Sequence, residues 1–71
     1  MVKKKSHVRN SIRELRFKHG EMTQQALAEK VGVARQTIIA VEQGRFCPSL
    51  ETALRMAQVF GVTVDEIFVL E

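Results

Sequence analysis

Apolar residues recur every three or four positions through much of this chain, a spacing that predicts helices rather than strands. The clearest pattern runs from residue 23 to residue 44, in two short segments separated by Gly32. In the first segment Leu27 and Val31 lie four apart with Ala28 beside Leu27, so one face of the helix is apolar. Gly32 then allows a sharp turn, because a left-handed backbone angle is least costly at glycine.

The second segment begins at Ala34 or Arg35 and stops at Gly44, a typical helix-ending residue. Ile38 and Val41, three apart, lie on its inner face. Its outer face carries Arg35, Gln36, Thr37 and Ala40. Two short helices joined by so tight a turn indicate a helix-turn-helix, and we expect the second helix to protrude.

A protruding helix of this composition is a candidate for DNA recognition. The major groove of B-DNA admits one α-helix, and Arg and Gln can each make two hydrogen bonds to a base edge there. Residues at the start of such a helix reach the bases. The alternative is that Arg35, Gln36 and Thr37 form only the solvated face of an amphipathic helix. Gln36 taken alone favours this alternative.

Helical patterns also flank this unit. Before it, Val8, Ile12 and Leu15 are expected on the inner face of a first helix, with Ser6 or Asn10 as its N-cap. After it, Ser49 is expected to cap a fourth helix with a core face made of Leu50, Ala53, Leu54, Ala57 and Phe60. Thr63, with Glu66 three residues later, is a capping box for a short fifth helix with Val64, Ile67 and Phe68 on its apolar face.

Two segments of the chain resemble the lambda-repressor-like, Cro-type (Xre) regulators. The first is residues 23–44, where Gln24, Ala28, Gly32, Ile38, Val41 and Gly44 are in register with that family. The second is residues 48–68, which is similar to the family's fourth and fifth helices. The resemblance implies an all-α, five-helix lambda-repressor-like DNA-binding domain with its helix-turn-helix at helices 2 and 3.

The resemblance also implies roles for individual residues. Base contacts are expected from Arg35, Gln36, Thr37 and Ala40, and phosphate contacts from Thr23, Gln24, Gln43 and Arg45. A structural ion pair is expected between Arg16 and Glu42, although the connection before Thr23 is one residue longer than the family's commonest spacing. Ile39 stands where the family often has a small polar residue. Contact with a thymine methyl group and exposure without function are equally open for it.

The length of 71 residues allows one small domain, whose modest core would benefit from oligomerisation. Residues 1–45 hold ten Lys and Arg against four Asp and Glu, whereas residues 46–71 hold one against four. A basic surface suits phosphate, so the nucleic-acid face is expected on the first three helices. We expect residues 1–7 to be a basic arm, adding at most sequence-independent attraction, and residues 8–71 to be the domain.

Several other functions find no support in the sequence. The single cysteine, Cys47, with only His7 and His19 as further soft ligands, offers no zinc-binding spacing, and we expect it to sit in a loop. No cofactor site, small-molecule site or catalytic constellation is recognisable, so an enzyme is not expected. No apolar run is long enough for a membrane span or a signal peptide, which predicts a cytoplasmic protein.

The end of the chain is apolar, and apolar residues beside a terminus need a partner. Many repressors of this kind pair through their last helix, so we expect a homodimer built on Ile67, Phe68, Val69 and Leu70. The alternative is that these residues complete the core of the monomer. The leading hypothesis is a repressor that binds a pseudo-palindromic operator on double-stranded DNA. The second hypothesis is a protein-interaction module, such as an antitoxin or a coactivator.

Overall fold

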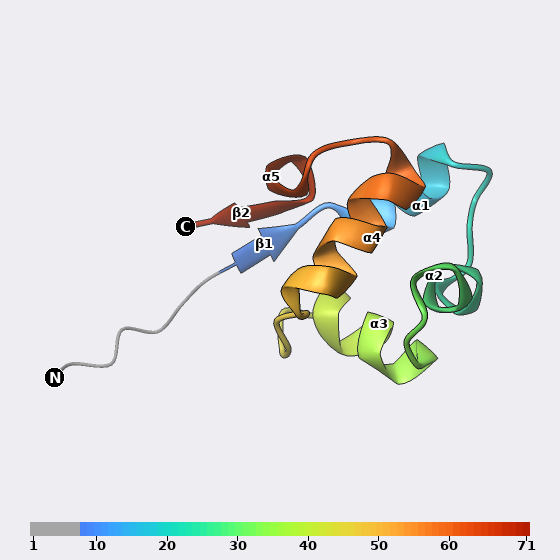
Figure 1. Cartoon of the computed structure of the whole chain (residues 1–71), viewed down its shortest axis with the longest axis horizontal. Coiled ribbons are helices and arrows are strands. Elements are labelled where there is room, and N and C mark those ends of the chain that lie inside the picture. Colours follow the sequence, from blue (N-terminus) through green and yellow to red (C-terminus); the bar gives the residue numbers. More distant parts are fainter. Residues whose placement is uncertain (1–7) are drawn as a thin grey trace, which may run out of the picture.

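The computed structural model describes residues 8–71, which form five helices and two short strands (Figure 1). The helices are α1 (Ile12–Lys18), α2 (Gln24–Val31), α3 (Arg35–Glu42), α4 (Leu50–Phe60) and α5 (Val64–Ile67). The strands are β1 (Val8–Asn10) and β2 (Phe68–Leu70). The predicted basic arm and the candidate cap Ser6 lie outside the described residues.

The expectation of an all-α fold is corrected by a two-stranded antiparallel sheet at the ends of this segment. Val8 lies opposite Leu70, and Arg9 lies opposite Val69. Val8 therefore belongs to β1 and not to the first helix, where its spacing of four from Ile12 had placed it. Pairing between strands so far apart in the sequence leaves no local pattern from which it could be predicted.

Local signals set several of the helix ends. Thr23 and Ser49 cap α2 and α4 with side-chain oxygens that accept an amide hydrogen from three residues later, at 2.9 and 3.1 Å. Gly32 ends α2 with a φ of 79°, a left-handed angle that favours glycine. The predicted capping box at the start of α5 is present, and the amide of Thr63 donates to the Glu66 carboxylate at 2.8 Å.

All five helices contribute to one apolar core. Its buried members are Ile12, Leu27, Ala28, Val31, Ile38, Val41, Met56, Ala57, Phe60 and Ile67. The prediction for α4 is only partly right, because Leu50 and Leu54 are 73% and 49% exposed. Met56, which the sequence reading left out, is fully buried in their place. The face of α4 that packs inward is thus rotated from the predicted one.

The chain end divides into a buried part and an exposed part. Ile67 is fully buried and Phe68 half-buried against the core, so the four residues expected to form a dimer surface do not all reach the surface. Val69 and Leu70 are 43% and 76% exposed. The expected four-residue dimer surface is corrected because β2 pairs with β1 and turns Ile67 inward. Ile67 thus completes the core of the monomer, as the alternative prediction stated.

Candidate nucleic-acid interface

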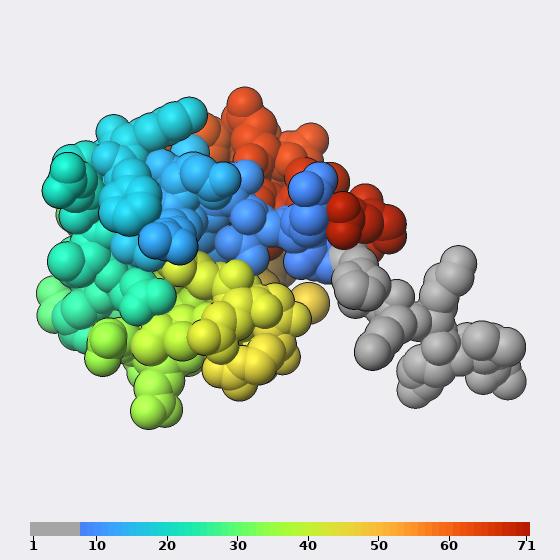
Figure 2. Space-filling model, turned by 180° about the vertical axis from the view of Figure 1, so that it is seen from behind, coloured from blue at the N-terminus to red at the C-terminus, as the bar shows by residue number. Residues whose placement is uncertain are grey.

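The turn between α2 and α3 brings the two helices into close contact. Ala28 is 1% exposed, and its carbonyl oxygen accepts the amides of Gly32 and Val33 at 2.8 and 3.0 Å. These bonds close α2 and lead the chain directly into α3. Helix α3 lies at the margin of the fold (Figure 1), and its yellow-green atoms project at the lower edge of the space-filling view (Figure 2). The second helix therefore protrudes.

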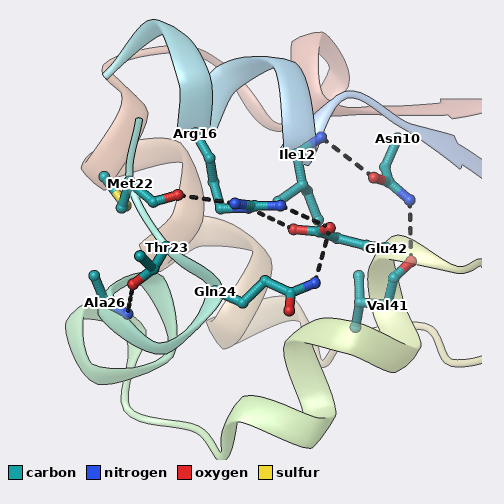
Figure 3. Close-up of polar contacts among 9 residues, drawn as sticks. All are labelled: Asn10, Ile12, Arg16, Met22, Thr23, Gln24, Ala26, Val41 and Glu42. Carbon is teal, nitrogen blue, oxygen red and sulfur yellow. Dashed lines mark hydrogen bonds and ion pairs between the residues drawn. The ribbon is translucent and has the colours of Figure 1, made fainter. Parts of the chain in front are cut away.

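A buried ion pair fixes the end of α3 against α1 (Figure 3). Arg16 donates from Nε to Oε2 of Glu42 at 2.7 Å and from Nη2 to Oε1 at 3.1 Å. The remaining guanidinium nitrogen, Nη1, donates to the carbonyl oxygen of Met22 at 2.8 Å. The two charged side chains are only 9% and 10% exposed. The ion pair expected from the family pattern is present despite the longer connection before Thr23, and the Met22 carbonyl of that connection binds the same guanidinium.

Two amide side chains add further bonds to the same end of α3 (Figure 3). Gln24, the first residue of α2, donates to Oε1 of Glu42 at 3.3 Å. Asn10 donates to the carbonyl oxygen of Val41 at 3.0 Å and accepts the Ile12 amide at 3.2 Å. The prediction of Asn10 as the N-cap of α1 is wrong, because Ser11 is the N-cap and Asn10, the last residue of β1, only accepts the amide of the first helical residue. The link to α3 had no sequence signal, because it joins residues that only the fold brings together.

The outward face of α3 carries most of the residues that the sequence reading assigned to bases. Arg35 and Gln36 are exposed, and Thr37 and Ala40 are half-buried. A hollow lined by Gln36, Ile39, Ala40 and Arg45 lies on one side of this face. A second hollow lies on the opposite side of α3. Of the four residues expected to contact bases, Thr37 lines neither hollow.

The second and larger hollow lies between α1, the start of α2 and α3. Its lining includes Thr23, Gln24 and Gln43, three of the four residues expected to contact phosphates. Arg45, the fourth, lies on the other side of α3, where its Nε donates to Oε1 of Gln43 at 2.7 Å. The Thr23 hydroxyl oxygen accepts the Ala26 amide in its capping bond. The candidates therefore surround α3 rather than forming one cluster.

Positive charge on this side of the molecule is largely uncompensated. Within residues 8–71 the ion pairs are Arg9–Glu71, Arg16–Glu42 and Arg55–Glu51, so Arg13, Arg35 and Arg45 have no carboxylate partner there. Arg13 instead lies over the ring of Phe17, 5.6 Å from its centroid. Phe17 is 51% exposed. Arg13 and Arg35 share the larger hollow with Gln24.

Other chemistry is sparse in the described part of the chain. Cys47 is exposed and forms no disulfide. Between residues 8 and 71 no group of three His, Cys, Asp or Glu side chains gathers in a way that could hold a metal ion. Over the same range, none of the helices has the length and apolar character needed to cross a membrane.

Comparison with known proteins agrees with this geometry. The family model described as "Helix-turn-helix" matches residues 12–67. An uncharacterized HTH-type transcriptional regulator of Methanocaldococcus jannaschii is 45% identical over 64 residues, which cover 90% of this chain and 96% of the relative. The cryptic phage CTXphi transcriptional repressor RstR of Vibrio cholerae is 34% identical over 58 residues, covering 82% of this chain and 51% of RstR.

A solved structure supports the same assignment. The restriction-modification controller protein C.AhdI of Aeromonas hydrophila superposes with a TM-score of 0.69 and 33% identity, over 78% of this chain and 82% of C.AhdI. The matched family and its members are DNA-binding regulators, so the chain is not an enzyme. With its helix-turn-helix at α2 and α3, the chain belongs to the Xre-type helix-turn-helix family of transcriptional regulators.

Proposed function

We propose that this protein is a repressor that binds a pseudo-palindromic DNA operator as a homodimer, with α3 in the major groove. The observation that carries the proposal is that α3 is fixed at its end and exposes hydrogen-bond donors at its start. The buried Arg16–Glu42 pair holds the end of α3, while Arg35 and Gln36 at its start are exposed. The relative RstR, named a phage transcriptional repressor, favours repression over activation.

In this proposal Arg35 and Gln36 read base edges, because both side chains can bind one base through two hydrogen bonds. Thr37 and Ala40 are assigned to the edge of the same contact, since both are half-buried. Gln24, Gln43 and Arg45 would hold the DNA backbone on the two sides of α3.

Thr23 would contact the DNA backbone at the start of α2. Its hydroxyl oxygen accepts the Ala26 amide, and its hydroxyl hydrogen could donate to a phosphate in the larger hollow that Thr23 lines. The proposal places the protein in the cytoplasm, together with the DNA that it would bind.

The homodimer is proposed to pair through apolar residues of the C-terminal half. Leu50 and Leu54 are exposed on α4, and Leu54 also lines a largely apolar hollow together with Ala57, Val62 and Val64. A two-fold interface needs one self-complementary patch, and a projecting leucine next to an apolar hollow meets that need. The exposed Val69 and Leu70 are the remaining candidates from the predicted tail surface. Such a dimer would present two recognition helices roughly 34 Å apart.

The proposed function is tested by binding the protein to a randomised duplex pool, sequencing the bound fraction, and measuring the selected duplex over a salt series. We expect an enriched inverted repeat and an affinity that falls steeply with salt, because phosphate contacts release counterions. Weak salt-sensitive binding without an enriched sequence would contradict the proposal. It would instead favour the second hypothesis, a module whose main partner is another protein.

The dimer is tested by sedimentation of the wild type, Leu54→Glu and Leu70→Glu across the micromolar range. Wild type is expected to be dimeric, and Leu54→Glu monomeric, because a charge would enter the apolar hollow of the partner. A monomeric Leu70→Glu beside a dimeric Leu54→Glu would move the interface to the β2 tail. A wild type that remains monomeric at high micromolar concentration would contradict the homodimer.

A further inference from the structure

Ile39 is an apolar residue in a place where packing does not explain it. It is half-buried in α3, yet it belongs neither to the core cluster nor to the partly buried residues that pack against the core. A β-branched residue is also a weaker helix former than many alternatives at an exposed position. Stability of the monomer therefore gives no reason for isoleucine here.

The surroundings of Ile39 are those of a contact residue. It lines both hollows beside α3, with Arg35 and Gln43 on one side and Gln36 and Ala40 on the other. Successive residues of a helix are rotated by about 100°, so Ile39 lies between Arg35 and Gln36 when the helix is viewed along its axis, one turn further on. Any surface that meets Arg35 and Gln36 also meets Ile39.

We propose that Ile39 contacts the C5-methyl group of a thymine and makes the operator specific for thymine at that position. The inference rests on the proposed function, since it requires α3 to enter the major groove. Among the groups on the major-groove edges of the four base pairs, the thymine C5-methyl is the one alkyl group. An isoleucine side chain has no hydrogen-bonding group, so the thymine methyl is the feature on a base edge that it can favour.

This contact would complement the polar ones. Arg35 and Gln36 can distinguish bases by donors and acceptors, whereas cytosine and thymine also differ by a methyl group that hydrogen bonds do not sense. Ile39 therefore adds a base pair to the recognised sequence without adding charge. Its effect is expected at one thymine in each half-site.

The experiment replaces each thymine of the selected operator in turn by uracil, which removes only the methyl group. Affinities are measured for wild type, Ile39→Ala and Gln36→Ala. At one thymine per half-site, uracil should weaken wild-type binding about fourfold, the change in Kd that corresponds to losing one buried methyl-sized group. Ile39→Ala should lose this sensitivity to uracil, and Gln36→Ala, the matched control, should keep it. Because Ile39 lies outside the core, Ile39→Ala should keep the thermal midpoint of wild type.

Two results would overturn the inference while leaving the proposed function intact. One is tight binding by wild type that is indifferent to uracil at every thymine. The other is an Ile39→Ala variant that keeps the full uracil sensitivity of wild type, which would assign the methyl contact to another side chain. A pool that yields no enriched operator would instead contradict the proposed function itself, before any uracil duplex is made.

Discussion

In the helix-turn-helix half of the domain, polar bonds to the end of α3 add to the core packing of its Ile38 and Val41. The carboxylate of Glu42 accepts hydrogen bonds from Arg16 and Gln24, and the carbonyl oxygen of Val41 accepts one from Asn10 (Figure 3). In the C-terminal half, α4 and α5 are held by apolar packing through Met56, Phe60 and Ile67. The first half leaves cationic side chains exposed, and the second leaves leucines exposed.

The difference indicates how one small domain can serve two kinds of partner. Directed polar bonds fix the orientation of α3, which a helix that reads bases needs, because misplaced donors lose their hydrogen bonds. Apolar packing is less directional, and it leaves Leu50 and Leu54 available for a second copy of the chain. The charge division along the sequence has the same sense, since the basic half would face DNA and the acidic half would face away.

The largest expected effect comes from breaking the buried ion pair. Arg16→Ala should lower the free energy of unfolding by about 3–5 kcal/mol, because Glu42 would keep a buried charge without its partner. Urea denaturation measures this loss. The control is Arg55→Ala, which breaks the exposed pair with Glu51 and should cost less than about 1 kcal/mol.

A double-mutant cycle separates the ion pair from the general effect of each substitution. Arg16→Ala, Glu42→Gln and the double variant should show a favourable coupling energy, because the two side chains share two hydrogen bonds. A coupling energy near zero would show that the first half is not held by this pair, and the contrast between the halves would fail.

The second prediction compares two positions within α4. Met56→Ala should lower the free energy of unfolding by about 2–5 kcal/mol, because it opens a cavity in the core. Leu54→Ala should change it by less than about 0.5 kcal/mol when measured at a concentration where the protein is monomeric, since Leu54 is half exposed. Equal losses of unfolding free energy for the two variants, in thermal or urea unfolding, would indicate that Leu54 packs in the core. They would contradict the observed rotation of α4.

The smallest expected effect distinguishes Gln36, proposed to read a base, from Arg45, proposed to contact a phosphate. Gln36→Ala should cost roughly 1–3 kcal/mol of discrimination at one base pair, whereas Arg45→Ala should weaken all sequences alike and reduce the salt slope by about one. Sequence selection with both variants, followed by a salt series, measures the two effects. A Gln36→Ala variant that selects the same site with the same discrimination would remove Gln36 from base reading.

Much of the helical framework was predictable because its signals are local. Thr23 and Ser49 cap helices with their own side chains, and Gly32 adopts its left-handed angle within the turn that it makes. The capping box joins Thr63 and Glu66, which are only three positions apart. The ion pair between Arg16 and Glu42 was expected only through family resemblance, since nothing local joins these positions.

The sequence of this chain was sufficient for the succession of five helices, the turn between α2 and α3, and the charge division between the halves, because these depend on neighbours within one or two turns. Tertiary structure decided that Val8 pairs with Leu70, that Met56 rather than Leu54 faces inward, and that Ile67 is buried. In each case the local pattern did not exclude the arrangement that the structure has. The free energy that separates them comes from strand pairing and apolar contact between segments distant in the sequence.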